Sequence, residues 1–274
     1  MNRLFVSYKP SGIGSNLFLS KLKRKYNNKK AGFTGTLDPF AKGVLIVGFG
    51  SHTKLFRFLN KTPKTYRATL WLGAHSDSLD TEMIDSVELL SEFSDEEVKE
   101  TVKSLEGSLE YEPPIFSAKR INGQRAYDLA RAGKEFTLNK INSTIYESKL
   151  IHYCHPFVTF EATVSEGTYI RSLGRIIAKR LGVKDGSLSA LERLNEGQFT
   201  YDGEVALDIK KSLNIPLNIY TGDEQNVNYG RVLALEDLEI KDDGYYWLDN
   251  GDNISVINII DAEVKYELGR IYTC

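Results

Sequence analysis

Short apolar runs and alternating segments recur along the chain and predict several strands and a long helix. Residues 4–8 and 44–47 are short apolar runs, typical of buried strands. Residues 65–72 and 157–164 alternate between apolar and polar positions, as a strand with one buried face does. Apolar residues at helical spacing predict a helix over residues 170–181.

Capping and turn signals predict shorter elements between these segments. Ser15 is expected to cap a helix that runs to about Tyr26. Ser94 and Glu97 form a capping box, and its helix is expected to end near Gly107. Other signals predict a short helix over 51–59, a hairpin turn at Asn122-Gly123 and a short helix around 127–131.

The balance of these elements predicts the fold class. Strands outnumber long helices and are not regularly interleaved with them, which favours an α+β chain with a mixed or antiparallel sheet. Residues 232–272 hold short strands between Gly, Asp and Asn turns and could form a small β appendage. The length of 274 residues suits one large domain, or one domain with such an appendage.

Several classes of protein and site are disfavoured by what the sequence lacks. No apolar run is long enough for a transmembrane helix, and the first residues do not resemble a secretory signal. Two cysteines, Cys154 and Cys274, make no disulfide framework, which fits a reducing cytosol. There is no P-loop, no HExxH, no GxSxG and no GxGxxG motif, and the four histidines make no recognised ligand set. We therefore expect no cofactor and no metal.

Charge is strongly segregated along the chain. Residues 1–67 contain 14 Lys and Arg, and Asp38 is their single acid. Residues 68–112 contain 2 basic and 13 acidic residues, and residues 201–274 contain 6 and 15. A cationic face of this kind most often meets phosphate, although solvated lysines on exposed helices would explain part of the pattern.

Asp38 is the most informative single residue. It lies before Pro39 at the end of a loop, residues 32–39, that holds two glycines and two threonines. The ordinary interpretation is a turn or a helix cap, because Asp-Pro is common at both. The functional interpretation is that a lone carboxylate among cations has a depressed pKa and is ionised, ready to act as a nucleophile or base.

Two other side chains are candidates for the same chemistry. Arg171 stands at the start of an expected helix, a poor place for a cation, so it could pair with a distant carboxylate such as Asp38. The alternative is an ordinary surface arginine. Tyr66 lies between Lys64 and Arg67 on an expected strand. It could be a core residue, or it could stack on a planar base.

Motifs spread over residues 1–200 carry a family resemblance. They are Lys9-Pro10 with Gly12 and Ser15, GFTGTLDPFAKGVLIV, Thr53-Lys54, Lys64-Thr65-Tyr66, HSDSLD, PPIFSAKRINGQRAYDLARAG, EGTYIRSLGRIIAKRLG and LERLNEGQF. Together they resemble the TruB family of tRNA pseudouridine synthases. The resemblance implies a pseudouridine synthase domain over 1–215, with a large, mostly antiparallel mixed sheet, flanking helices and a central cleft. It also implies a small β-rich, PUA-like module over 216–274.

The resemblance assigns an activity and three catalytic residues. It implies an isomerase that converts uridine 55 in the T loop of tRNA to pseudouridine after flipping the base out of its stack. Asp38 matches the family's catalytic aspartate, and Tyr66 matches a tyrosine that stacks on the target base and is implicated in proton removal. Arg171 matches the arginine that pairs with the aspartate.

The resemblance also implies residues that bind the substrate. Tyr169 and Leu191 match positions that line the uridine pocket, and Lys9 and Lys54 match basic positions near the cleft. Phe33 stands where the family usually has His, and it keeps a flat surface for stacking. A segment over about 119–149 matches an insertion that clamps the T loop.

The expected partner is therefore the T arm of tRNA, bound by a cytoplasmic monomer without a membrane, metal or small-molecule cofactor. The alternative is a catalytically silent RNA-binding protein or tRNA-folding chaperone on the same scaffold, in which Asp38 is only a turn residue. A third interpretation, an enzyme that binds phosphate in a loop over 32–43, is disfavoured because that loop has an anion at its centre.

Overall fold

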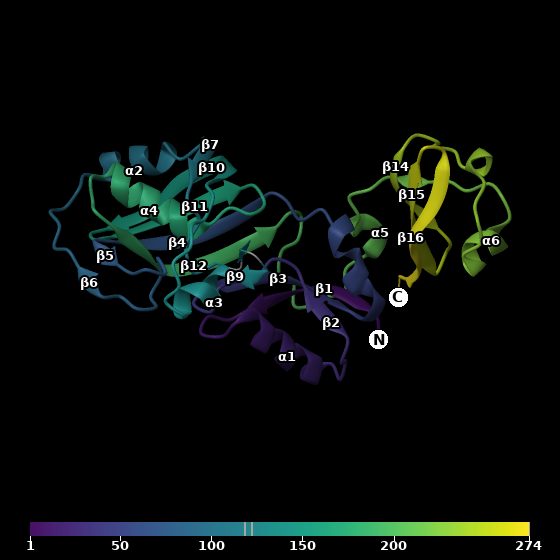
Figure 1. Cartoon of the computed structure of the whole chain (residues 1–274), viewed down its shortest axis with the longest axis horizontal. Helices are drawn as coiled ribbons and strands as arrows, with labels where there is room; N and C mark the ends of the chain where they lie inside the picture. The colour runs from purple at the N-terminus through teal and green to yellow at the C-terminus, as the bar shows by residue number, and fades with distance from the viewer. Residues whose placement is uncertain (118, 122, 274) are drawn as a thin grey trace.

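The computed structural model describes residues 1–117, 119–121 and 123–273. Its main feature is an eight-stranded sheet (Figure 1). Neighbouring strands follow the order β1 (Arg3–Lys9), β3 (Lys42–Phe49), β12 (Gly186–Glu196), β4 (Lys64–Leu72), β11 (Phe157–Val164), β10 (Ile141–Cys154) and β7 (Gly107–Tyr111), with β2 (Ala31–Phe33) beside β3. β12 runs parallel to β3, and the other neighbouring pairs are antiparallel. The expected α+β class with a mixed, mostly antiparallel sheet is confirmed.

Helices cover the two halves of this sheet separately. α2 (Asp95–Lys103) and α4 (Ile170–Arg180) pack with β4, β10 and β12, whereas α1 (Ser15–Lys25) lies beside β2 (Figure 1). On β4, the alternation seen in the sequence buries Tyr66, Ala68, Leu70 and Leu72 on one face, in the core that α2 and α4 complete.

The start of α1 differs from its prediction. Gly14 is the N-cap residue, and Ser15 is the first residue of the helix. The Ser15 hydroxyl donates to the carbonyl of Leu37 at 2.9 Å and accepts from the N–H of Leu37 at 3.0 Å. The expected cap was wrong because this hydroxyl ties the helix start to the loop that carries Asp38.

Two other predicted helices have different ends or geometry. Ser94 accepts a hydrogen bond from the N–H of Glu97, as a capping box requires, but α2 ends at Lys103 rather than near Gly107. The segment after β3 is a 3-10 helix, η1 (Gly50–Phe58).

A protruding segment follows β7. It contains the paired strands β8 (Arg120–Ile121) and β9 (Gln124–Arg125), followed by α3 (Ala126–Arg131). Asn122 of the predicted turn lies outside the described residues. The expected insertion over 119–149 extends into the large sheet, because β10 begins at Ile141 and pairs there with β7.

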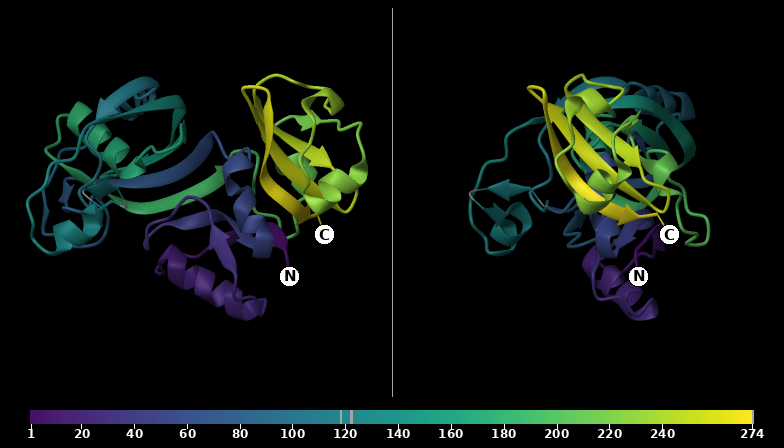
Figure 2. Two further views of the ribbon diagram at one scale, coloured as in Figure 1. Left: turned by 45° about the vertical axis from the view of Figure 1, so that its right-hand side comes forward. Right: turned by 90° about the vertical axis from the view of Figure 1, so that its right-hand side faces the viewer.

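A second sheet lies in the C-terminal part of the chain, which is called the C-terminal module below (Figure 2). It contains β13 (Leu217–Asn218), β14 (Gly244–Asp249), β15 (Asn253–Ile260) and β16 (Glu263–Tyr272), flanked by α6 (Glu224–Tyr229) and η2 (Leu235–Asp237), and α5 (Ile209–Ser212) precedes it. This confirms the small β appendage. Leu4, Leu55 and Phe58 share one apolar cluster with Trp247 and Ile254, so the module packs against β1 and η1. Cys274 lies outside the described residues.

Among the described residues, no helix combines the length and the apolarity that crossing a bilayer requires.

Candidate active site

The loop between β2 and β3 carries Asp38 and is held at several points. The N–H of Thr34 donates to Ile46 on β3 at 3.0 Å, and Gly12 donates to the carbonyl of Pro39 at 2.8 Å. The Leu37 side chain is 4% exposed and packs into the core below α4. A loop pinned on both sides of Asp38 holds that carboxylate in a fixed place.

Arg171 pairs directly with Asp38. It lies in the first turn of α4, and its Nε atom is 3.0 Å from Oδ2 of Asp38. Its other nitrogens donate to the carbonyls of Ser78 at 2.7 Å and Phe116 at 2.9 Å, and Nη1 lies 3.7 Å from Oδ2 of Asp80. The pairing expected from the sequence is present, and four partners fix the guanidinium in orientation.

The pKa of Asp38 differs from expectation. Burial in the cleft raises the pKa of the carboxyl above its usual range, and the negative charges of Asp80 and Glu82 raise it further. Arg171 and Lys9 oppose the shift without cancelling it. The expected depression was wrong because it considered only neighbours in sequence, whereas desolvation and distant acids act in the folded chain. One edge still faces the cleft, since 36% of the side chain is exposed.

Four of the other predicted residues share one hollow with Asp38. This first hollow has a volume of about 330 Å³, and its lining includes Tyr66, Tyr169, Arg171 and Leu191. Tyr66 comes from β4 and Leu191 from β12, the neighbouring strand of the sheet. Tyr66 and Leu191 therefore form part of the wall beside a carboxylate that an arginine orients.

A second hollow lies against the same ion pair and was not anticipated. It has a volume of about 270 Å³, and Asp38 and Arg171 line it as well. Its other walls include Asn16 at the start of α1 and Arg125 and Arg131 of the protruding segment. The sequence had given a signal here in the motif over 113–133, but no single residue of it had been assigned to the cleft.

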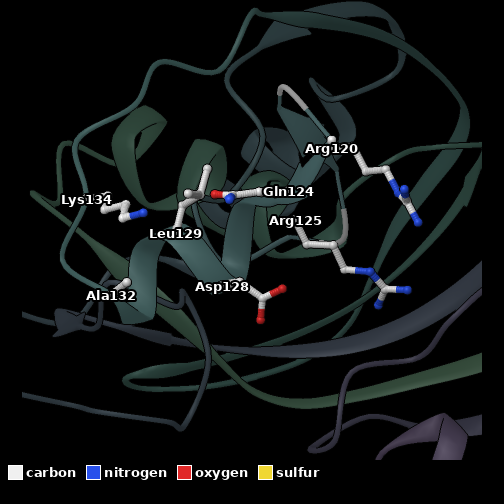
Figure 3. Close-up of a pocket in the computed structure, with 8 residues that line it drawn as sticks. Arg120, Gln124, Arg125, Asp128, Leu129, Ala132 and Lys134 are labelled. Carbon is white, nitrogen blue, oxygen red and sulfur yellow. The ribbon is translucent and has the colours of Figure 1, made fainter.

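The protruding segment has a hollow of its own, with a volume of about 470 Å³. Figure 3 shows the guanidinium groups of Arg120 and Arg125 extending on the same side, with Asp128 and Lys134 nearer to α3. Arg125 lines both this hollow and the second hollow, so cationic side chains continue from the segment to the cleft.

Lys9 is not placed to contact a substrate. It is 0% exposed, and its ammonium donates to the carbonyls of Pro10 at 2.9 Å and Ile13 at 2.7 Å. Burial lowers its pKa to about 8. The expected binding role is corrected, because the β1 register turns this side chain inward to hold the neighbouring loop.

Phe33 and Lys54 also lie outside the two hollows that Asp38 lines. Phe33 packs its ring against the apolar cluster between α1 and the sheet, which includes Phe18 and Leu22. Lys54 is exposed on η1. The family resemblance had suggested substrate contacts for both residues, and neither side chain lines the hollows beside Asp38.

Comparison with solved structures defines the class of fold. The chain resembles a chain of a Cbf5-Nop10-Gar1 complex with a TM-score of 0.66 and 20% identity, over 98% of this chain and 83% of that one. An archaeal box H/ACA sRNP Nop10-Cbf5 complex gives a TM-score of 0.65 and 19% identity, over 98% and 84%. This is the pseudouridine synthase fold.

Sequence comparison then gives the family. The model described as "TruB family pseudouridylate synthase (N terminal domain)" matches residues 23–170, more than half of the chain. The tRNA pseudouridine synthase B of Sulfurimonas denitrificans is 76% identical over 271 residues, 99% of each chain. That of Campylobacter jejuni (strain RM1221) is 48% identical over 274 residues, 100% of each. The chain belongs to the TruB family of pseudouridine synthases, which are isomerases.

Proposed function

We propose that this protein converts uridine 55 in the T loop of tRNA to pseudouridine, with Asp38 as the nucleophile. The observation that carries the proposal is the contact of 3.0 Å between Arg171 and Asp38 beside a hollow walled by Tyr66, Tyr169 and Leu191. The tRNA substrate is supported by the relatives, which are tRNA pseudouridine synthases B.

The chemistry needs no oxidant, reductant or phosphoryl donor. The bond between C1′ and N1 of the uridine breaks, the base rotates and a bond forms between C1′ and C5. The proton on C5 is lost, and N1 gains one. The ionised carboxylate of Asp38 begins the reaction, and attack at C1′, addition at C6 and a glycal route all use that same group.

The walls of the first hollow suit a base that has left its stack. Flipping a base costs a few kcal/mol, and stacking on an aromatic ring recovers part of this. Tyr66 offers its ring from β4, while Leu191 supplies an apolar contact from β12. Tyr66 is also the residue proposed to assist the removal of the C5 proton.

Binding of the RNA is proposed to depend on cations outside this hollow. We propose that phosphates of the T arm meet Arg120 and Arg125 on the β8–β9 pair and Arg131 at the end of α3, since these arginines line the neighbouring hollows. Phosphate contacts of this kind position an RNA, whereas shape and the flipped bases give selectivity.

The decisive test is Asp38→Asn, assayed on T-arm RNA by mapping pseudouridine. The substitution keeps the shape of the side chain and removes its nucleophilic charge, so pseudouridine should disappear while T-arm affinity stays within a few-fold. Asp202→Asn, the same chemical change on an exposed residue, is the matched control and should keep full activity. Turnover retained by the Asp38 variant would refute the nucleophile. Untouched uridine with folded wild type would favour the silent RNA-binding protein.

A further inference from the structure

A cluster of three buried charges lies beneath the loop of Asp38. Glu196 on β12 is 0% exposed and is 3.2 Å from the ammonium of Lys64 on β4. Arg193, also on β12 and 1% exposed, brings Nη2 to 3.3 Å from the other Glu196 oxygen. The strand register puts Glu196 opposite Lys64 and Arg193 opposite Tyr66. The cluster therefore belongs to the two strands that build the wall of the first hollow.

The loop rests directly on this cluster. Arg193 donates from Nη2 to the carbonyl of Gly35 at 2.9 Å and from Nε to the carbonyl of Val44 at 2.8 Å. Gly35 has φ +53°, and a Cβ there would lie 2.8 Å from Arg193 and 3.0 Å from Glu196. Arg193 thus joins the loop, three residues before Asp38, to the charge that Glu196 supplies.

Stability alone does not explain such an arrangement. Removing charges from water costs free energy. A protein with well-packed apolar residues at such positions is often at least as stable as one with a buried ion pair there. Within the described residues, neither oxygen of Glu196 accepts a hydrogen bond of good geometry, so the carboxylate interacts with its two cations mainly through charge. Its geometric effect is to hold Arg193 where that side chain reaches Gly35.

We propose that Glu196 and Arg193 are positioning residues for pseudouridine formation. Glu196 fixes Arg193, Arg193 fixes the carbonyl of Gly35, and the loop then presents Asp38 to the flipped uridine at a set distance. The inference rests on the proposed role of Asp38 as the nucleophile. Neither residue is required to touch the RNA.

The test separates turnover from binding. Glu196→Gln keeps the side-chain volume and removes the charge that holds Arg193. We expect the single-turnover rate constant to fall by about 100-fold, the scale of a 1 Å misplacement, while the Kd for T-arm RNA stays within about twofold. Glu192→Gln is the matched control on the same strand, because Glu192 contacts Tyr8 and Lys42 instead of the loop. It should keep the wild-type rate.

The outcomes decide between positioning and a merely structural role. A folded Glu196→Gln enzyme with a lower melting temperature and the wild-type rate would overturn the inference, and so would a loss confined to Kd. If that variant does not fold, Gly35→Ala on the exposed loop decides: a slow enzyme with unchanged affinity supports the inference, and a wild-type rate overturns it. Wild type without activity would refute the proposed function as well.

Discussion

At the scale of single residues, the properties of Asp38 come from side chains far away in the sequence. Arg171 orients the carboxylate, whereas burial and Asp80 favour its protonated form. A nucleophile with a raised pKa is a stronger base but is ionised over a narrower range of pH. The pH below which the reaction rate falls therefore depends on the groups that surround this carboxyl.

The pH dependence of the rate tests this description. In the proposed mechanism Asp38 must be ionised to react. Because its pKa is raised, the single-turnover rate should then fall as pH drops through that raised value. Asp80→Asn removes a negative charge that raises the pKa, so the acid limb should move to lower pH. Asp202→Asn should leave the limb in place. A limb that moves to higher pH in Asp80→Asn would contradict the assignment.

At the scale of elements, the end of β1 and the start of α1 together hold the loop that carries Asp38. Lys9 closes the turn after β1 by donating to Pro10 and Ile13, while Ser15 exchanges two hydrogen bonds with Leu37. Lys9 was expected to contact the substrate and Ser15 to cap a helix. Both side chains instead form hydrogen bonds that join segments within the fold.

Lys9→Met tests this structural role. The substitution leaves the carbonyls of Pro10 and Ile13 without their buried donor, which should lower the free energy of unfolding by about 1–3 kcal/mol. Denaturant unfolding measures this. Lys54→Met, on an exposed lysine, should change stability by no more than about 0.5 kcal/mol. T-arm affinity that falls tenfold in a stable Lys9→Met protein would show instead that Lys9 binds RNA.

At the scale of the whole molecule, the acidic C-terminal part of the chain contrasts with the cationic N-terminal segment. Of the residues in 201–274, 6 are basic and 15 acidic, whereas 1–67 contain 14 basic residues and one acid. The C-terminal module lies at one end of the large sheet, and α1 lies along another edge (Figure 2). If the protein binds the T arm as proposed, the RNA should therefore lie along the large sheet, on the side where α1 begins at the second hollow.

Salt dependence of T-arm binding measures this division. Replacing Lys21, Arg24 and Lys29 by alanine should flatten the slope of log Kd against log salt by up to about 1 for each phosphate that the variant no longer neutralises. The matched control replaces Arg231, Lys241 and Lys265, three exposed cations of the acidic module, and should keep the slope. An equal change in both variants would show that the RNA also lies across the module.

The sequence predicted the features that depend on nearby residues. The alternation of β4, the capping interaction of Ser94 and the glycine-rich loop before Asp38 all appear as expected. β12 was missed, because the buried charges of Arg193 and Glu196 interrupt the apolar pattern that indicates a strand. These charges find their partners only in the folded chain, where they lie beside Lys64 and the loop that carries Asp38.

By itself, the sequence determined the fold class, the segregation of charge and the loop that carries Asp38, since these follow from periodicity and composition. Tertiary structure decided that Asp38 has a raised pKa, that Lys9 is internal and that Phe33 packs under α1. The physical reason is that desolvation and charge pairing depend on which distant segments surround a side chain, and strand register sets this only when the sheet assembles.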